Sequence, residues 1–284
     1  MRLDDQPESS NVEDRRGMGF GGGPRMVAAG GIGGLGLVAV IVLGLLFGVD
    51  PATLLSIVEG GQQQTYQQQA SGPRQSQPGV EDSQRRFVAQ VLGSTESVWT
   101  NEFAQHGRRY QAPTLVLFSG AVQSACGLAE SAMGPFYCPQ DQKVYLDTSF
   151  FRDMQVKLGA PGDFPRAYVI AHEIGHHIQN LLGLLSASRS NDASVRTELQ
   201  ADCLAGVWAN RANATTHILE QGDIEEGINA ATAIGDDRLQ QRARGYVVPD
   251  SFTHGSSAQR ARWFTRGVQT GDLTQCDTFH ANRL

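Results

Sequence analysis

One short segment of the sequence, AHEIGHHIQN from Ala171 to Asn180, contains a glutamate and three histidines. On an α-helix, residues four positions apart point the same way to within about 40°. His172 and His176 therefore share one face, and Glu173 lies at the rim of that face. Two neutral imidazoles at this spacing bind Zn²⁺, and the glutamate beside them is placed as the general base for a zinc-bound water. The pattern predicts a hydrolytic metal site.

A catalytic zinc site needs a third protein ligand and keeps its fourth position open. The later segment TELQADCLAGVWA provides Glu198 and Asp202, which are four residues apart and share a helix face. The chain after His176 is long enough to turn and return antiparallel before it reaches them. We predict Glu198 as the third ligand, and Asp202 as the acceptor of a hydrogen bond that fixes the tautomer of a ligand histidine. Two solvated carboxylates are the simpler interpretation, but apolar residues surround both.

Two other residues of the histidine segment have different expected roles. His177 faces away from His172, so we interpret it as a supporting or structural residue rather than a ligand. Gly175 removes a side chain at a point where the helix of Glu198 or a substrate must approach closely.

The elements that must position these residues follow from hydrophobic periodicity. A long apolar helix over 164–182, with Gly183 as its C-terminal stop, carries the histidines, and a helix over 195–210 carries the carboxylates. Further helices are predicted over 87–103, 149–159, 223–242 and 256–267, and buried strands over 114–118 and 143–147. The predicted fold class is therefore α+β and mainly α-helical, with a small sheet formed early in the domain.

An uncharged apolar run at residues 26–49 is long enough to cross a bilayer as one helix. A cleavable signal peptide would have a shorter apolar region and a small-residue cleavage site. Arg15, Arg16 and Arg25 precede the run, so the positive-inside rule places residues 1–25 in the cytoplasm and the rest of the chain outside it. The sequence thus predicts a single-pass transmembrane protein of the cytoplasmic membrane with a periplasmic domain.

Residues 50–81 are predicted to be a flexible linker, because Glu59 to Glu81 is rich in Gln, with Gly, Ser and Pro, and has almost no large apolar side chain. The globular domain then covers residues 82–284. Glycine pairs in the apolar run, such as Gly30 and Gly34, could pack such helices into an oligomer, although glycine is common in membrane helices in any case.

The four cysteines all lie in the predicted domain, and an even number outside the cytoplasm indicates disulfides. Of the three possible connectivities we favour Cys126–Cys138, which closes a short loop, and Cys203–Cys276, which ties the C-terminal tail to a helix. Four free buried thiols would be more typical of a cytosolic chain. No C-x-x-C pair is present, which argues against a cysteine zinc site.

The charge of the chain argues against one class of partner. The formal net charge is −6, and no basic stripe with interleaved aromatic residues is present in the sequence. A chain of this kind does not track a phosphate backbone, so nucleic acid is not an expected partner.

Together, the two motifs resemble the gluzincin metallopeptidases, the thermolysin-like class with H-E-x-x-H and E-x-x-x-D. More closely, the chain resembles the putative neutral zinc metallopeptidase family of bacterial membrane-anchored proteins. The blocks that carry the resemblance span nearly the whole chain: NVEDRRG, the glycine-rich anchor, GPFYCPQDQKVYLD, AHEIGHHIQ, ELQADCLAGVWA, ATAIGDDRLQ and FTHGSSAQR. The resemblance implies a zincin-like fold and a metallopeptidase with one Zn²⁺ per chain, and it implies no defined substrate.

The expected reaction is hydrolysis of an amide bond. Zinc activates a water and polarises the scissile carbonyl, and Glu173 moves the water's proton to the leaving amine. Thermolysin-like enzymes also use a histidine downstream of the glutamate ligand to stabilise the oxyanion. His254 is the best-placed candidate here, with Tyr246 and His217 as weaker alternatives. A local hydrogen bond in the loop before a helix explains His254 equally well.

A charged cluster follows Gly235 and consists of Asp236, Asp237 and Arg238. Exposed ion pairing explains such a cluster without a catalytic role. We therefore place it outside the predicted site.

The sequence favours a membrane-anchored zinc metallopeptidase acting on a peptide or protein substrate, which one of the early strands could pair as a sheet edge. Two alternatives remain open. One is a zinc-stabilised binding or scaffold protein of the cell envelope without catalysis, and the other is a zinc amidase acting on a non-peptide envelope polymer. Glu173 favours an enzyme, because a structural zinc site has no need of a base beside it.

Overall fold

The computed structural model describes residues 1–17, 78–185, 188 and 190–284. The described residues 1–17 and those from Gly79 onward belong to one compact unit. The predicted membrane anchor at 26–49 lies outside the described residues, as does the predicted linker up to residue 77. Within the described residues, no helix is both long and apolar enough to span a membrane.

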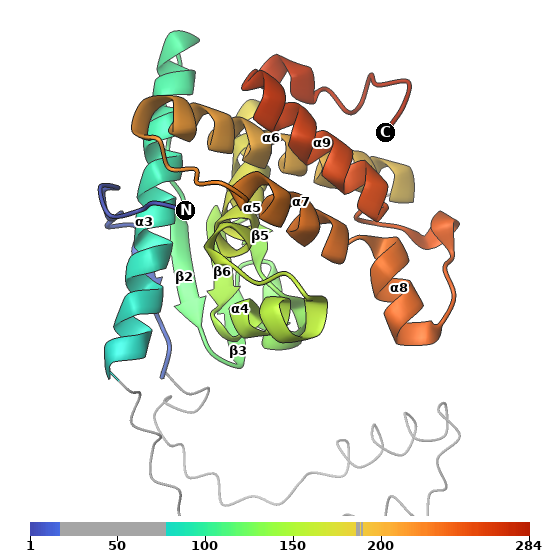
Figure 1. Ribbon diagram of the computed structural model, residues 1–284, viewed down its shortest axis with the longest axis horizontal. Coiled ribbons are helices and arrows are strands. Elements are labelled where there is room, and N and C mark those ends of the chain that lie inside the picture. The colour runs from blue at the N-terminus through green and yellow to red at the C-terminus, as the bar shows by residue number, and fades with distance from the viewer. Residues whose placement is uncertain (18–77, 186–187, 189) are drawn as a thin grey trace, which may run out of the picture. The chain divides into compact units, whose positions relative to one another are not determined.

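The described part of the chain is mainly helical with small sheets (Figure 1). Its strands are β1 (Val12–Asp14), β2 (Thr114–Phe118), β3 (Ala121–Ser124), β4 (Gly127–Glu130), β5 (Phe136–Cys138) and β6 (Lys143–Asp147). Its helices are α3 (Pro78–Gln105), α4 (Ser149–Asp153), α5 (Asp163–Leu182), α6 (Asn191–Thr216), α7 (Asp223–Ala233), α8 (Asp236–Arg244) and α9 (Ser257–Thr270). Shorter helical turns lie at Ser131–Met133, Met154–Leu158, Pro249–Ser251 and Leu273–Cys276, the last of which is η5.

The main sheet has the strand order β1-β2-β6-β5. β2 pairs in parallel with both β1 and β6, whereas β5 runs antiparallel to β6, and β3 and β4 form a separate antiparallel hairpin. The strands predicted at 114–118 and 143–147 are β2 and β6, because continuous apolar runs are typical of buried parallel strands. The other strands are three or four residues long and carry too little periodicity to be predicted.

The two faces of the main sheet contribute to different cores, since neighbouring residues of a strand point to opposite faces. Leu115 and Leu117 of β2 belong to the main core, which also contains apolar residues of α3, α5, α6 and α9. Val116 and Phe118 belong to a smaller core with residues of the β3–β4 hairpin. α5, the helix that carries the histidines, therefore packs on the face of the sheet to which Leu115 and Leu117 point.

Close helix packing brings α5, α6 and α9 together. α6 and α9 lie side by side, and a Cβ on Gly267 of α9 would clash with the backbone of Cys203 on α6 (Figure 1). α5 also packs on α6, where a Cβ on Gly175 would lie 2.9 Å from the carbonyl oxygen of Ala201. The close approach of α6 expected at Gly175 is therefore confirmed.

The single helix predicted over 223–242 is wrong. It is divided into α7 and α8 at Gly235, because the start of α9 packs against this point. A Cβ on Gly235 would clash with the backbone of Ser257, and the N–H of Asp236 donates to the carbonyl of Gly255. A tertiary contact thus ends a helix that local periodicity would continue.

The N-terminal residues pack into the same unit as the rest of the domain. β1 pairs with β2, Leu3 is buried in the main core, and the N–H of Ser9 donates to the carbonyl of Ala89 on α3. A chain that crossed a membrane once between β1 and α3 would separate these paired segments. The packing therefore requires β1 and β2 to lie on the same side of any membrane, whereas the sequence predicts opposite sides.

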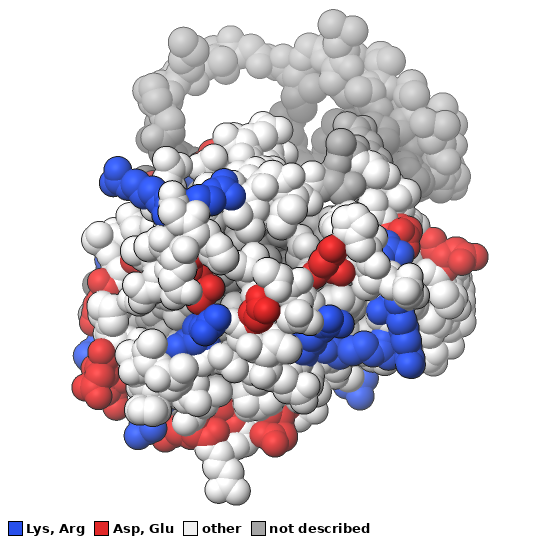
Figure 2. All heavy atoms as spheres, turned by 90° about the horizontal axis from the view of Figure 1, so that it is seen from above, with Lys and Arg blue, Asp and Glu red and all other residues white. Residues whose placement is uncertain are grey.

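The charged side chains on the face seen in Figure 2 form small groups of both signs. Lys and Arg groups lie next to Asp and Glu groups on this face. The described residues of this face therefore present no continuous basic surface.

Candidate metal centre

α5 carries His172, Glu173 and His176 through the buried middle of the domain. Asp163 lies in its first turn, where a negative charge suits the helix dipole, and Gly183 ends it in the left-handed conformation with φ of 71°. The two imidazole rings lie on one side of the helix with their centroids 4.8 Å apart. The spacing of His172 and His176 along the helix therefore lets one nitrogen of each ring face the same metal ion.

Glu198 on α6 completes a group of three potential metal ligands. Its carboxylate oxygens lie 3.1 Å from Nε2 of His172 and 3.6 Å from Nε2 of His176. One donor atom from each of the three residues lies within 4.8 Å of the other two. Two imidazoles and one carboxylate are typical ligands of catalytic zinc, so the donor set fits this ion.

The charges around the three donors favour a cation. Burial alone would lower the pKa of His172, but Asp202 and Glu198 outweigh burial and raise this pKa to about 10. Burial would raise the pKa of Glu198, yet His176 and His172 hold it well below its ordinary value. In the metal-free chain, protons on the imidazoles balance the carboxylates, and a bound metal ion takes the place of those protons.

Asp202 lies behind His172, on the side away from Glu198. Nδ1–H of His172 donates to Asp202 over 2.8 Å, which leaves Nε2 free to face a metal ion. Asp202 is fully buried, and burial would raise its pKa, but Arg260 and His172 lower the pKa to about 2. The carboxylate is therefore ionised at neutral pH.

Two residues that do not belong to the sequence-predicted site hold Asp202 in place. Arg260 of α9 is 2% exposed and donates from Nε and Nη2 to the two carboxylate oxygens, each over 2.9 Å. The hydroxyl of Tyr168 donates to the same carboxylate over 2.5 Å. Tyr168 lies four residues before His172 and so shares its helix face, and Arg260 falls on the apolar face of α9. The spacing between Tyr168 and His172 and the position of Arg260 on an apolar helix face can both be read from the sequence.

A cavity of about 760 Å³ opens onto the three donors. Glu173 also lines this cavity, is 7% exposed, and does not belong to the group of donor residues. Apolar side chains line much of the remaining wall, among them Phe136, Phe150, Leu158, Leu185, Ile234 and Leu239. The cavity therefore gives a substrate access both to the donors and to a carboxylate that is not a ligand.

His254 lies in the loop before α9 and lines the same cavity. Its Nδ1 lies 3.0 Å from Oγ1 of Thr253 and 3.4 Å from the carboxylate of Asp236. One oxygen of Asp236 also accepts hydrogen bonds from the backbone N–H groups of Thr253, His254 and Gly255. Asp236 is 8% exposed and holds this loop, so exposed ion pairing is the wrong interpretation for it.

The other candidates from this part of the sequence lie elsewhere. Tyr246 is 58% exposed, and His217 ends α6 in the left-handed conformation with φ of 51°. Neither residue lines the cavity in the described part of the chain. Asp237 accepts hydrogen bonds from the backbone and hydroxyl of Ser257 and so supports the start of α9.

His177 points toward the sheet rather than toward the three donors. Its Nε2–H donates to the carbonyl of Gln111 over 2.7 Å, and its Nδ1 lies 3.0 Å from the hydroxyl of Tyr137. Burial lowers the pKa of His177, so Nδ1 is the acceptor in this pair. Asn180 also donates to the Tyr137 hydroxyl. His177 thus anchors β5, where Tyr137 lines the cavity.

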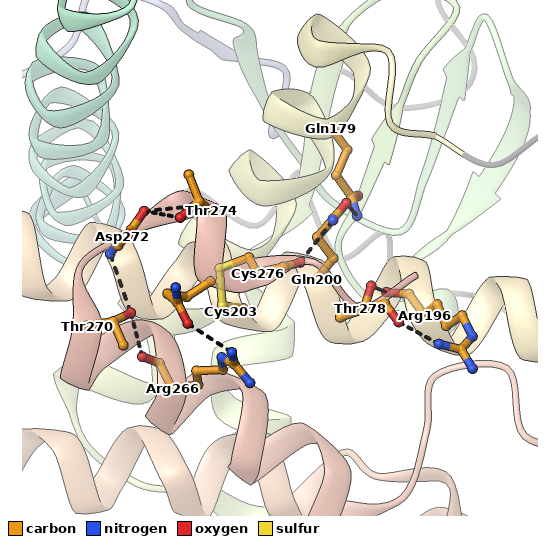
Figure 3. The surroundings of a disulfide bond; sticks show 11 residues. Gln179, Arg196, Gln200, Cys203, Arg266, Thr270, Asp272, Thr274, Cys276 and Thr278 are labelled. Atoms are coloured by element: carbon orange, nitrogen blue, oxygen red, sulfur yellow. Dashed lines mark hydrogen bonds between the residues drawn. A yellow bond between two sulfur atoms is a disulfide. The ribbon is translucent and has the colours of Figure 1, made fainter. Parts of the chain in front are cut away.

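Both favoured disulfide pairings are present. Cys126–Cys138 joins the turn of the β3–β4 hairpin to the end of β5. Cys203–Cys276 joins α6 to η5 near the C-terminus, across a sequence separation of 73 residues (Figure 3). The second bridge starts from the residue directly after Asp202, so it fixes the chain end close to the candidate metal centre.

Comparisons with known proteins place the chain in a family whose description names zinc. The family model described as "Putative neutral zinc metallopeptidase" matches residues 1–279. The chain is 48% identical to "Uncharacterized protein YpfJ" of Escherichia coli strain K12, over 98% of this chain and 99% of that protein. It is 43% identical to "Uncharacterized protein Mb2605" of Mycobacterium bovis, over 84% of this chain and 86% of that protein. No solved structure matches the chain.

Proposed function

Since the chain belongs to the putative neutral zinc metallopeptidase family, we propose that it is a zinc-dependent peptidase that hydrolyses peptide bonds in the cavity beside α5 and α6. The observation that carries this proposal is the position of Glu173. Its buried carboxylate lines the same cavity as the three donors and is not one of them. A general base for hydrolysis requires such a place beside the metal and open to substrate.

The residues around the cavity have different roles in this reaction. His172, His176 and Glu198 would hold the zinc ion, which when bound supplies a Lewis acid for water activation and carbonyl polarisation. Glu173 accepts the proton of the attacking water and passes it to the leaving amine. His254 donates a hydrogen bond to the oxygen of the tetrahedral intermediate.

β5 is the segment best placed to bind an extended peptide. It lies at the end of the sheet order, and in the described residues it pairs only with β6. Phe136 and Tyr137 of β5 line the cavity. A peptide added to this free edge would gain backbone hydrogen bonds and pass along the donors, as strand addition does in peptide recognition.

The alternative functions differ in what they require of the cavity. A structural zinc site in a scaffold protein is closed by a fourth protein ligand, whereas this donor group has three members and opens onto a cavity. That difference favours catalysis. A zinc amidase for a non-peptide envelope polymer could use the same donors, and substrate assays separate it from a peptidase.

The two disulfides support a location outside the cytoplasm, where such bonds persist. We place the catalytic domain there. Because β1 is part of the same sheet, the N-terminal residues must then lie outside as well. This placement replaces the cytoplasmic N-terminus that the positive-inside rule predicts.

The proposal is tested with the full-length protein and a mixed peptide pool analysed by mass spectrometry. We expect one zinc ion per chain, new peptide termini after incubation, loss of cleavage with a chelator and recovery when zinc is added back. Zinc at one ion per chain without any cleavage would favour the scaffold. Cleavage of an amide-linked envelope polymer, but of no peptide, would favour the amidase.

His254 is expected to set an alkaline limit on peptide hydrolysis. Its hydrogen bond to Asp236 raises its pKa, against the effect of burial. Because the Asp236 carboxylate favours a proton on Nδ1, the protonated ring is the form in which Nε2 donates to the oxyanion, so kcat/KM should fall as pH rises through this pKa. Asp236→Asn removes the charge that raises the pKa, and the alkaline limit should move to lower pH.

The measurement is the pH profile of kcat/KM for the wild type and Asp236→Asn, with Asp250→Asn as the control. Asp250 is exposed in the same loop region, and its replacement should leave the profile unchanged. An identical alkaline limit in wild type and Asp236→Asn would remove His254 from the oxyanion role.

A further inference from the structure

A buried glutamine holds the second histidine donor. Nδ1–H of His176 donates to Oε1 of Gln179 over 2.8 Å, and Gln179 is fully buried. The amide nitrogen of Gln179 donates to the carbonyl of Thr197 over 2.8 Å and to Oε1 of Gln200 over 3.0 Å. Because an amide nitrogen can only donate, these two acceptors turn the Gln179 oxygen toward His176. The ring then carries its proton on Nδ1 and keeps Nε2 free.

A second buried glutamine continues this chain of hydrogen bonds to the C-terminal tail. Gln200 of α6 is 5% exposed, and its amide nitrogen donates to the carbonyl of Cys276 over 3.0 Å (Figure 3). That bond turns its oxygen toward Gln179. Cys276 is held by the disulfide to Cys203, so the covalent bridge fixes the acceptor at the far end of the chain.

We propose that Gln179 and Gln200 form a relay, from His176 to the carbonyl of Cys276, that makes metal binding by His176 depend on the Cys203–Cys276 disulfide. The two histidine donors are thus held differently. A charged pair, Asp202 and Arg260, orients His172, whereas His176 relies on neutral amides that Thr197 and the tail hold in one direction.

The disulfide matters to the relay because it fixes Cys276, the residue whose carbonyl ends the relay. Arg196 and Thr278 exchange hydrogen bonds beside the bridge, and the bond from Gln200 ends on Cys276 itself. Without the bridge, only noncovalent contacts hold the carbonyl of Cys276, so the acceptor of Gln200 loses its covalently fixed position. A buried donor without an acceptor turns to other partners, and Gln179 then has one bond, to Thr197, in place of two to keep its oxygen on His176.

The inference rests on the proposed zinc site, and zinc affinity measured by chelator competition tests it in the full-length protein. Gln179→Met removes the acceptor for His176, so affinity should fall about 10–100-fold, the usual loss when a partner of a metal ligand is removed. Gln179→Glu keeps an oxygen opposite Nδ1, and its affinity should stay within about threefold of wild type. Both variants alter the contacts to Thr197 and Gln200, so a purely structural role would affect them alike.

The disulfide is tested with a matched pair of double variants. Cys203→Ala with Cys276→Ala should weaken zinc binding, whereas Cys126→Ala with Cys138→Ala should leave it unchanged. The protein with Cys126→Ala and Cys138→Ala keeps the Cys203–Cys276 disulfide but lacks the other one. A reductant added to this protein breaks Cys203–Cys276, so reduction should lower its zinc affinity although Gln179 and Gln200 are unchanged. In the Gln179→Met background, loss of the Cys203–Cys276 bridge should have no further effect, because the relay is already interrupted.

Circular dichroism of the metal-free proteins confirms that each variant is folded before its affinity is measured. Equal losses in Gln179→Met and Gln179→Glu would overturn the relay, as would an effect of the bridge that is the same with and without Gln179. Wild-type protein that binds no zinc would instead contradict the proposed function. The two failures are therefore distinguishable.

Discussion

Replacing Glu173 by glutamine is expected to abolish peptide hydrolysis while one zinc ion per chain is retained. Glutamine has the same shape but cannot accept and pass on the proton of the attacking water. Loss of a general acid–base group costs about 10²–10⁴-fold in rate. The three donor residues are His172, His176 and Glu198, so the metal should stay. Zinc content and kcat/KM on a cleaved peptide measure the two effects separately.

Glu225→Gln is the matched control for this substitution. Glu225 lies exposed on α7, and its replacement makes the same change in charge away from the cavity. It should keep wild-type activity and wild-type zinc. A Glu173→Gln protein that binds zinc and still cleaves peptides at the wild-type rate would exclude Glu173 as the base.

Replacing Arg260 by leucine is expected to lower the free energy of unfolding by about 3–5 kcal/mol, the usual cost of removing one partner of a buried ion pair. Arg260 donates to both oxygens of Asp202, and both residues are almost fully buried. Leucine would leave the carboxylate without the cation that binds both of its oxygens. Tyr168 and His172 would remain its partners, but the proton charge of His172 is shared with Glu198 on the other side of the ring. Urea unfolding of the metal-free protein measures the loss.

Arg262→Leu provides the comparison on the same helix. Arg262 is exposed, and exposed substitutions usually change stability by no more than about 0.5 kcal/mol. Adding Asp202→Asn to Arg260→Leu should restore part of the stability, because the unpaired charge is then removed. If Arg260→Leu is no less stable than Arg262→Leu, the ion pair does not support the site in the way its geometry indicates.

Local patterns accounted for a large part of the fold. The two central strands and the histidine helix coincide closely with β2, β6 and α5, and Gly183 ends α5 as its position indicates. These features depend on side chains a few residues apart, so their periodicity is visible in the sequence alone. The hairpin β3–β4 and the break at Gly235 depend on partners elsewhere in the chain, and local periodicity carries no signal for them.

The candidate site divides in the same way. By itself, the sequence determined which residues could act as zinc donors and which as base, because a helix repeats every 3.6 residues and places His172, His176 and Glu173 relative to one another. Glu198 followed from the same rule on a second helix.

Only the tertiary structure decided what holds those donors in place. Arg260 donates to Asp202 from α9, and Gln200 accepts from Gln179 and donates to the carbonyl of Cys276 in the tail. Each of these contacts joins segments that are distant in the chain. Their geometry depends on how closely helices and strands pack, and no spacing within one segment encodes that distance.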